Sequence, residues 1–471
     1  MEFKQYIENS AKAFNTIDKK QTIRIISHID TDGICSAGIL TKALIRDKKK
    51  FSVTFVNYIT QDFIVKLSQE SHKNFVFLDL GTSQLKNIKT YLKDKKVFVL
   101  DHHVTRAKRS ENEEEQIYHA NPSLFNINSS REISAAGITY LFAKELNKKN
   151  MDLAYLGVVG AISDLQEENG FKGLNEEILN EAVASKKIIV EKGLKFFTSG
   201  TKPLYKLFMK SLSLYIPGLS GNEDKIFDFL NSVGIEQRTN NRWTRISDLE
   251  REQTERLVKE VSRIKVGEKE IKESKDIYAN TYRCLSINEE IKNLKQLSTL
   301  LNACGCLDRA SLGLGLLLGD KKSFIRATYT LKEYNREIIS TLNWLESNKK
   351  TRRTIEQNGH IILNAETSTN PKILGTATSM LAQNLNVAEG IYLVTLSRDR
   401  NKKTKISMRM TGNKQNKGLV KLLRKVIEPF EGECGGHSNS AGGVIDVKYE
   451  QQFIENAKNE LSKKAIEEVI E

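Results

Sequence analysis

The sequence predicts an α/β protein whose first domain is a parallel β-sheet flanked by helices. Short, almost continuous apolar runs recur near the N-terminus, and such runs are typical of parallel strands covered on both faces. These runs occupy residues 22–26, 51–58, 74–81 and 96–103. Helical patterns lie among them at 34–46, 62–70 and 83–93. The alternation indicates successive β-α-β units, and a similar alternation near the C-terminus indicates a second α/β domain.

The length of 471 residues is too great for one hydrophobic core, so we expect several domains. Their predicted bounds are 1–195 for the first α/β domain, 196–322 for an insertion with a connector region, and 323–471 for a linker helix with the second α/β domain. The insertion is polar and basic, with a charged helix at 247–265, and carries no metal-ligand pattern. Cys304 and Cys306 frame a Cys-x-Cys sequence, but no second pair has suitable spacing. We therefore favour structural packing over a zinc site.

Acidic and histidine residues stand at the ends of several apolar elements of the first domain. After the first strand, His28, Asp30 and Asp32 alternate, so an extended backbone would point all three side chains to one side. Further along the chain stand Asp79, Asp101, His102 and His103 at strand ends, and Asp164 after an apolar helix at 153–162. Because open α/β folds hold ligands at the carboxyl edge of the sheet, we expect these residues to gather there.

This mixture of carboxylates and imidazoles suits Mn²⁺ or Mg²⁺ better than a thiol-rich zinc site. Two metals about 3.5–4 Å apart need a bridging carboxylate, and such a pair stabilises the charge that develops in phosphodiester hydrolysis. A single aspartate at a strand end is more often a helix cap or a turn former. The recurrence of the pattern at four places favours the metal-site hypothesis.

The second α/β domain offers residues that suit a phosphate. Its predicted strands are 359–364, 390–396, 403–410 and 444–447, its helices are 374–385, 419–427 and a charged, solvent-facing one at 450–470, and a glycine-rich loop occupies 432–443. In that loop, Gly435, Gly436 and His437 could grip a phosphate through N–H groups and an imidazole, or form a tight turn with a capping histidine. Ser407 and Arg409 could add phosphate contacts, although a solvated basic edge strand is the alternative.

The formal net charge of +14 suggests an anionic partner, with nucleic acid first. A generally lysine-rich composition is the alternative, but positive charge beside a cluster of aspartates favours a nuclease. No run approaches the length of a membrane span, and the N-terminus lacks the apolar segment of a signal peptide. The five scattered cysteines fit reduced thiols. We therefore expect a cytoplasmic protein with no membrane partner.

Taken together, these residues resemble the DHH phosphoesterase superfamily. Its motifs are similar to His28-x-Asp30-x-Asp32-Gly33, Asp79, Asp101-His102-His103 and Asp164, and the signature of its companion DHHA1 domain is similar to Gly435-Gly436-His437. The insertion and the stretches SHIDTDGICSAGIL and NACG are similar to archaeal RecJ-like exonucleases, especially the GINS-associated nuclease (GAN). The implied fold is an N-terminal DHH domain, a helical or mixed insertion, a connector helix and a C-terminal DHHA1 domain. Residues 200–320 are the part of the chain that the resemblance covers least.

The resemblance implies a two-Mn²⁺ exonuclease, with Mg²⁺ as the other candidate ion. One ion would be held by His28, Asp30 and Asp79, and the other by Asp32, Asp79, His102 and Asp164. His103 would lie against the scissile phosphate or behind the metal ligands, and Asp101 would orient the histidine pair. Substrate phosphate would be bound by Ser407, Arg409, Gly435, Gly436 and His437. Cys306 departs from the family pattern, in which an arginine is expected at that position.

The leading hypothesis is an archaeal single-strand exonuclease for DNA or RNA, attached to the replisome through GINS and the replicative helicase. One alternative is a phosphodiesterase for oligoribonucleotides or cyclic dinucleotides, although such relatives usually lack a large insertion. Another is a replisome scaffold without catalysis, but every ligand position is present. No aromatic stacking platform stands out among the 14 tyrosines and 19 phenylalanines.

Overall fold

The computed structural model describes residues 2–103, 105, 116–167, 170–194, 202–210, 212–266, 278–285, 291–348, 351–357, 359–384, 389–412, 418–437 and 440–470. The chain forms two compact units. The first comprises Met1–Lys192 with Asn280–Leu331, and the second comprises Gly193–Ala279 with Lys332–Glu471. None of the described helices combines the length and the apolar composition needed to cross a bilayer.

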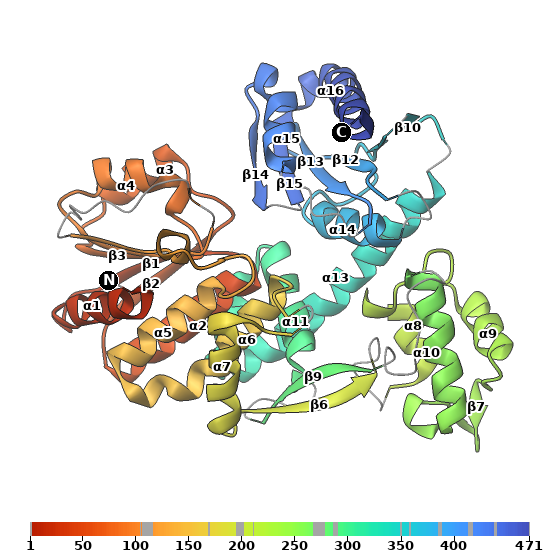
Figure 1. Cartoon of the computed structure of the whole chain (residues 1–471), viewed down its shortest axis with the longest axis horizontal. Helices are drawn as coiled ribbons and strands as arrows, with labels where there is room; N and C mark the ends of the chain where they lie inside the picture. Colours follow the sequence, from red (N-terminus) through yellow and green to blue (C-terminus); the bar gives the residue numbers. More distant parts are fainter. Residues whose placement is uncertain are drawn as a thin grey trace. The chain divides into compact units, whose positions relative to one another are not determined.

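The first unit contains a five-stranded sheet in which every pair of neighbouring strands is parallel (Figure 1). The strands lie in the order β2-β1-β3-β4-β5. Their bounds are Ile23–His28 for β1, Phe51–Val56 for β2, Asn74–Leu78 for β3, Lys96–Leu100 for β4 and Ile117–Ala120 for β5. The predicted parallel sheet is confirmed, and β5 adds a strand that the apolar runs do not reveal.

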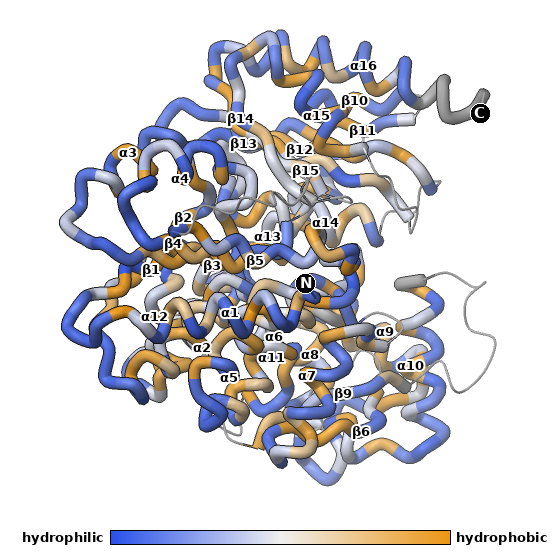
Figure 2. The backbone as a smooth tube through the Cα atoms, turned by 60° about the vertical axis from the view of Figure 1, so that its left-hand side comes forward, coloured by the Kyte–Doolittle hydropathy of each residue, from blue (hydrophilic) through white to orange (hydrophobic). Residues whose placement is uncertain are grey.

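Helices cover both faces of this sheet, with α1, α2 and α5 on one face and α3 and α4 on the other (Figure 1). Their bounds are Phe3–Asn15 for α1, Thr31–Arg46 for α2, Gln61–Ser68 for α3, Leu85–Tyr91 for α4 and Ala135–Leu146 for α5. Ile25 and Val76 belong to the core under the first face, whereas Ile26 and Phe77 belong to the core under the second. Because side chains alternate along a strand, a continuous apolar run fills both cores. Figure 2 shows hydrophobic segments concentrated in these strands and in the helices packed on them.

Helices from distant parts of the sequence complete the core of the first unit. They are α6 (Ala154–Ser163), α7 (Gly173–Ala184), α11 (Leu294–Cys306) and α12 (Ala310–Leu317). The residues of α6 are buried as far as Ile162, as its apolar sequence predicts. Leu297 and Leu301 of α11 join the same core, and α11 packs against both α2 and α6. A two-stranded sheet of β6 (Ile188–Leu194) and β9 (Tyr278–Cys284) lies where the insertion begins and ends.

The insertion contains a small helical group with a core of its own (Figure 1). Its helices are α8 (Leu204–Lys210), α9 (Glu223–Ser232) and α10 (Arg251–Val266), and a short hairpin is formed by β7 (Arg238–Thr239) and β8 (Arg242–Trp243). The charged helix predicted at 247–265 corresponds to α10. The long helix α13 (Lys321–Ser347) contacts this group, since Tyr215 Oη donates a hydrogen bond to Asn343 Oδ1 at 3.3 Å.

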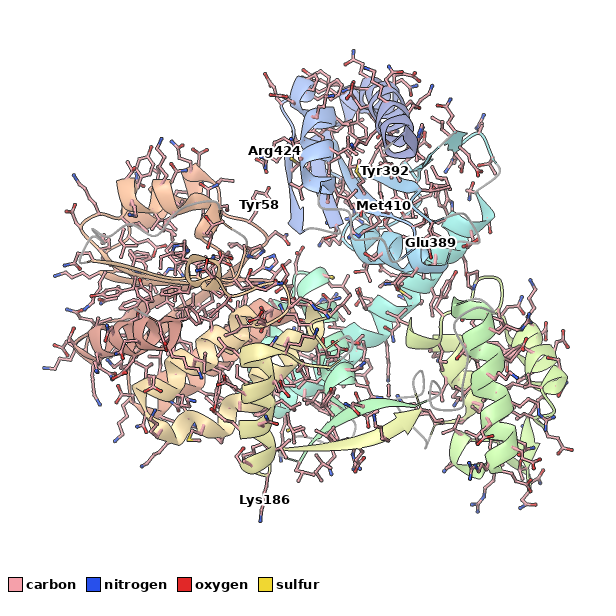
Figure 3. The ribbon with its side chains drawn as sticks, in the orientation of Figure 1. Tyr58, Lys186, Glu389, Tyr392, Met410 and Arg424 are labelled. Carbon is pink, nitrogen blue, oxygen red and sulfur yellow. The ribbon has the colours of Figure 1, made fainter. Side chains whose placement is uncertain are left out.

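A six-stranded mixed sheet forms the C-terminal part of the second unit, in the order β10-β11-β12-β13-β15-β14. The strands are β10 (Thr354–Gln357), β11 (His360–Asn364), β12 (Tyr392–Arg398), β13 (Lys403–Met410), β14 (Glu433–His437) and β15 (Ser440–Asp446). The helices are α14 (Leu374–Asn384), α15 (Leu419–Ile427) and α16 (Glu450–Ile470). Strands β11 and β12 pair in parallel, whereas the other described pairs of this sheet are antiparallel. Tyr392 and Met410, labelled in Figure 3, occupy paired positions on β12 and β13.

Two predictions for this domain are wrong. In the glycine-rich segment, residues 433–437 and 440–443 lie in the antiparallel strands β14 and β15 and not in a loop, because pairing with β13 extends the sheet and outweighs the loop preference of glycine. The C-terminal helix is not solvent-facing all round, since Phe453, Ala457 and Leu461 are fully buried. These residues are four apart and share one helix face, a pattern that the many charges obscure.

Candidate metal centre

The predicted motif at the end of β1 spans a change of backbone direction. Strand β1 ends at His28, and α2 begins at Thr31 with Asp30 as its N-cap. Asp30 Oδ1 accepts the N–H of Gly33 at 2.9 Å, while Oδ2 lies 2.9 Å from His28 Nδ1. Asp32 is already in the first helical turn. The extended backbone on which a simple alternation of the three side chains depends therefore ends before Asp32.

Asp32 is fully buried against two other helices. Its Oδ2 accepts the N–H of Ala135 at 2.7 Å, and its Oδ1 accepts the N–H of Ala136 at 3.0 Å. These amides are in the first turn of α5, where helical N–H groups lack partners within the helix and favour a negative charge. Gly160 of α6 lies against the same carboxylate, because a Cβ there would stand 2.1 Å from Asp32 Oδ1. Only glycine permits this approach.

Asp79 follows β3 with its backbone in the left-handed region, at a φ of 59°. Its N–H donates to the carbonyl oxygen of Leu100 at 3.0 Å, which holds this unfavourable conformation in place. The Oδ2 atom lies 3.1 Å from His28 Nδ1, and the Oδ1 atom lies 3.6 Å from His102 Nε2. Oδ1 is buried and has no hydrogen-bond partner among the described residues. Asp79 thus presents one oxygen to each of two histidines.

Asp101 and His103 form a second carboxylate–imidazole pair beyond the end of β4. Asp101 Oδ1 lies 2.7 Å from His103 Nδ1 and accepts the backbone N–H of His103 at 3.2 Å. Asp101 Oδ2 accepts the N–H of Thr82 at 2.9 Å. Although burial opposes ionisation, the adjacent His103 and the Thr82 bond hold the pKa of Asp101 well below its usual value. The ionised Asp101 therefore fixes the orientation of the His103 ring.

His102 turns away from this pair and joins Asp32 and Asp164. Its Nδ1 lies 3.1 Å from the carbonyl oxygen of Ser129, so this nitrogen carries the proton and Nε2 has a lone pair for a ligand. Nε2 lies 3.3 Å from Asp164 Oδ2 and 3.9 Å from Asp32 Oδ2. Asp164 caps the C-terminus of α6, and within the described chain its buried Oδ2 has no hydrogen-bond partner.

These donor atoms form overlapping groups, within each of which all atoms lie within 4.8 Å of one another. The groups among the described residues are His28, Asp30 and Asp79; Asp32, His102 and Asp164; and Asp79, His102 and His103. The first group is the ligand set predicted for one ion, and the second group is the set predicted for the other ion without Asp79. The third group shares Asp79 with the first group and His102 with the second, so it links the two. All eight residues predicted for the metal centre therefore lie together, since Asp101 holds His103.

Burial and charge repulsion dominate the electrostatics of the centre. Burial, followed by the charges of Asp30 and Asp32, raises the pKa of Asp79 well above its usual value. The pKa of Asp164 is raised well above its usual value for the same reasons, burial first and Asp32 next. Although burial opposes a charge on His28, its neighbour Asp30 raises the pKa of that imidazole.

The donor set fits divalent cations. Several buried carboxylates resist ionisation together unless positive charge compensates them. In the described structure, Asp79 Oδ1 and Asp164 Oδ2 each lack the partner that a buried carboxylate oxygen normally has. Carboxylate oxygens combined with imidazole suit Mn²⁺ and Mg²⁺, and no cysteine contributes to the groups among the described residues.

In the C-terminal sheet, Arg409 is held by neutral oxygen atoms. Its Nε donates to Ser379 Oγ at 2.7 Å and its Nη1 to Ser407 Oγ at 3.1 Å. Further acceptors are the carbonyl oxygens of Met408, Ala441 and Gly375. Burial lowers the pKa of Arg409 to about 10, and no carboxylate of the described chain pairs with it. A charged guanidinium in this setting fits an anion.

The predicted glycine motif lies close by in the same sheet. Gly435 pairs with Gly442, and Gly436 pairs with Ala441, whose carbonyl oxygen accepts from Arg409. The side chain of His437 lies outside the described residues. The structure thus brings Arg409, Ser407 and the glycines of β14 into neighbouring positions of one sheet.

Sequence reasoning missed the residues of α11 that support the metal-binding loop. Thr31 Oγ1 donates to the carbonyl oxygen of Ser298 at 2.9 Å, a contact between residues 267 positions apart. A Cβ at Gly305 would stand 1.9 Å from the carbonyl oxygen of Ile29. The only signal in the sequence is a glycine inside a helical pattern. That signal is slight, because the contacts of α11 with the metal-binding loop form only when α11 packs on α2.

Sequence models of three families match successive parts of the chain. They are the DHH family N-terminal domain over residues 22–159, the DHH-CID domain over 196–275 and the DHHA1 domain over 358–470. The chain belongs to the DHH superfamily. The resemblance predicted from the motifs is confirmed at this level, and the insertion of this DHH protein is a DHH-CID domain.

An uncharacterized protein of Methanocaldococcus jannaschii is 29% identical over 436 residues, which cover 92% of this chain and 91% of that protein. Among solved structures, CDC45 from Entamoeba histolytica has a TM-score of 0.62 at 13% identity, with 97% of both chains covered. The exonuclease RecJ bound to manganese has a TM-score of 0.58 at 15% identity, with 97% of this chain and 94% of that chain covered. RecJ of Thermus thermophilus in complex with Mn²⁺ has a TM-score of 0.59 at 14% identity, and the match covers 97% of this chain but 55% of that one. The DHH protein therefore has a RecJ-like fold.

Proposed function

We propose that this DHH protein is a metal-dependent phosphodiesterase that acts as a single-strand-specific exonuclease on DNA or RNA. The observation that carries the proposal is the pair of donor groups joined by Asp79, whose two carboxylate oxygens face different histidines. A carboxylate shared in this way is what a two-metal phosphodiester site requires. The manganese bound in the RecJ structures supports Mn²⁺ as the ion, with Mg²⁺ second.

The residues divide between two ions as follows. One ion would be held by His28, Asp30 and Asp79, and the other by Asp32, Asp79, His102 and Asp164. When bound, two such ions supply Lewis acidity at the phosphoryl group and an activated water. The buried carboxylates would hold the ions, and the contact of His102 Nδ1 with the carbonyl oxygen of Ser129 would orient Nε2 toward them.

His103 is the residue that we assign to contact with the scissile phosphate. Its Nδ1 is held by Asp101, which fixes the orientation of the ring and leaves Nε2 for the substrate. In this position His103 can form a hydrogen bond with a phosphate oxygen of the substrate. In the DHHA1 domain, Arg409, Ser407, Gly435, Gly436 and His437 are proposed to bind a substrate phosphate.

A polymeric substrate is favoured over a dinucleotide because the chain carries a DHH-CID domain in addition to the DHH and DHHA1 domains. The fold similarity to CDC45 supports the second candidate, a replisome scaffold without catalysis. The complete set of candidate ligands supports the nuclease instead. We also propose, from the motif resemblance, an archaeal, cytoplasmic protein that associates with GINS and the replicative helicase, which co-purification with recombinant GINS would test.

The decisive experiment digests end-labelled single-stranded DNA and RNA with the full-length protein and Mn²⁺. We expect progressive shortening from one end, and a loss of about 1,000-fold or more in rate for Asp79→Ala. Asp62→Ala, which removes an exposed carboxylate of α3, is the matched control. Equal activity of Asp79→Ala and the unaltered protein would overturn the two-metal proposal, and absence of activity in both would favour the scaffold.

A further inference from the structure

The β7–β8 hairpin of the DHH-CID domain presents arginines and aromatic rings on a rigid support. Its two-residue turn consists of Asn240 and Asn241, with φ values of 51° and 64°. Such a turn requires two left-handed residues, and asparagine adopts this conformation more readily than most. The base of the hairpin is fixed by the buried Thr244. The N–H of Thr244 donates to the carbonyl oxygen of Gln237 at 3.0 Å, and its Oγ1 donates to the carbonyl oxygen of Glu236 at 2.7 Å.

The aromatic rings beside the hairpin lie at the surface of the domain. Trp243 of β8 lies 4.4 Å from Tyr205 and 6.1 Å from Phe227, measured between ring centroids. Neither Trp243 nor Phe227 belongs to the buried cluster that α8, α9 and α10 enclose, and all three rings are partly exposed. A cluster of aromatic rings at the surface offers the flat apolar faces on which nucleobases stack.

Positive charge is concentrated around these rings. The segment 238–245 contains Arg238, Arg242 and Arg245 and no acidic residue. The guanidinium carbon of Arg238 lies 4.4 Å from the centroid of the Trp243 ring, an arrangement that leaves its N–H groups available at the edges. Arg238 and Arg242 are exposed, and in the part of the chain that the structure describes neither is paired with a carboxylate. These two arginines therefore keep their charge for an anionic ligand.

We propose that this hairpin is a binding site for single-stranded nucleic acid, in which Trp243 and Tyr205 stack against bases while Arg238 and Arg242 contact phosphates. The combination of unpaired arginines with partly exposed rings favours a single strand over a duplex, because only unpaired bases expose their faces. It also favours nucleic acid over an acidic protein segment, which would use the charges but not the rings. This inference rests on the proposed function, since it places part of a polymeric substrate on the insertion.

Fluorescence provides a direct test, because the chain has two tryptophans, Trp243 and Trp344. In a full-length Trp344→Phe protein, Trp243 is the single reporter. A thymidine oligonucleotide of about 20 nucleotides is titrated in the presence of EDTA, which prevents cleavage. We expect quenching of Trp243 emission as bases stack on it. Unchanged emission at saturation of binding, measured by anisotropy of the labelled oligonucleotide, would overturn the proposal.

The phosphate contacts are tested by the double variant Arg238→Ala with Arg242→Ala. We expect affinity for the oligonucleotide to fall about tenfold or more, and the slope of log affinity against log salt to decrease by about two. The matched control removes Arg251 and Arg263 of α10, which form ion pairs with Glu255 and Glu260, and should change neither quantity appreciably. Wild-type affinity and slope in the hairpin variant would exclude the hairpin as a binding site, as would an equal loss in the control.

The two proposals fail in different ways. Binding in EDTA does not require metal or hydrolysis, so an inactive protein that binds through the hairpin would refute the nuclease and retain the hairpin site. An active nuclease whose hairpin variant binds the oligonucleotide normally would refute the hairpin site and retain the nuclease. Far-UV circular dichroism and thermal unfolding of the hairpin variant establish that its fold is intact.

Discussion

Asp30 and Asp32 are two positions apart, yet their side chains belong to different donor groups. Asp30 caps α2 and contacts His28, whereas Asp32 enters the helix and contacts the N-terminus of α5. The separation follows from the change from extended to helical backbone between them. Neither the pattern of residues nor their spacing reveals this change, although the resemblance to DHH proteins implies that the two aspartates serve different ions.

This division predicts the outcome of single substitutions. We expect Asp30→Ala and Asp32→Ala each to lower the amount of bound Mn²⁺ from two ions to one, because each variant removes ligands of one ion only. Metal analysis after gel filtration measures the stoichiometry, and Asp62→Ala serves as the control. Loss of both ions in either variant, or of none, would contradict two separate donor groups.

His119 lies next to the centre and predicts a pH effect on stability. Its Nε2 is 2.9 Å from Thr82 Oγ1, and burial lowers its pKa from 6.5 to about 4. Because the folded-state pKa is the lower one, the stabilisation is complete above pH 6.5 and is lost as the pH falls toward about 4. The difference amounts to about 3 kcal/mol. Urea unfolding at pH 7 and near pH 4 should show a smaller loss for His119→Gln than for the unaltered protein, and equal losses would contradict the assignment.

At the scale of elements, the sequence predicts the strands of the first sheet well because each apolar run fills two cores at once. The same reasoning does not predict β14, whose glycine-rich sequence is stabilised as a strand by pairing with β15. It also does not predict the role of α11, because that depends on a contact between Thr31 and Ser298. Local patterns identify elements, whereas contacts between distant segments determine which elements support the site.

The support from α11 predicts a strong effect at Gly305. Replacement by alanine would place a Cβ 1.9 Å from the carbonyl oxygen of Ile29, so either α11 or the loop that carries Asp30 must move. We expect Gly305→Ala to destabilise the protein by about 2 kcal/mol and to weaken Mn²⁺ binding. Gly375→Ala in α14, where the nearest atom to a new Cβ is 3.7 Å away, is the control. Similar unfolding midpoints for the two variants would show that the contact is not required.

At the scale of the whole molecule, the motifs at the two ends of the chain predict the DHH and DHHA1 domains, and the family matches bear them out. The middle of the chain gives no such signal, because a small helical domain has ordinary amphipathic patterns. The sequence also does not predict its surface aromatic cluster. Tyr205, Phe227 and Trp243 come together only when α8, α9 and the hairpin pack.

The division of labour between the domains predicts how kinetic parameters respond. If Arg409 binds substrate phosphate while the DHH domain performs hydrolysis, Arg409→Gln should raise KM for a single-stranded oligonucleotide about tenfold with a smaller change in kcat. Asp79→Asn should instead lower kcat.

Because Arg409 also donates to Ser379 and Ser407, Arg409→Lys, which keeps the charge, separates the two roles. A bound phosphate requires charge, so Arg409→Lys should recover part of the affinity that Arg409→Gln loses, although lysine binds phosphate at a single point. If both variants lower kcat alike at unchanged KM, Arg409 supports the fold of the DHHA1 sheet and does not bind substrate.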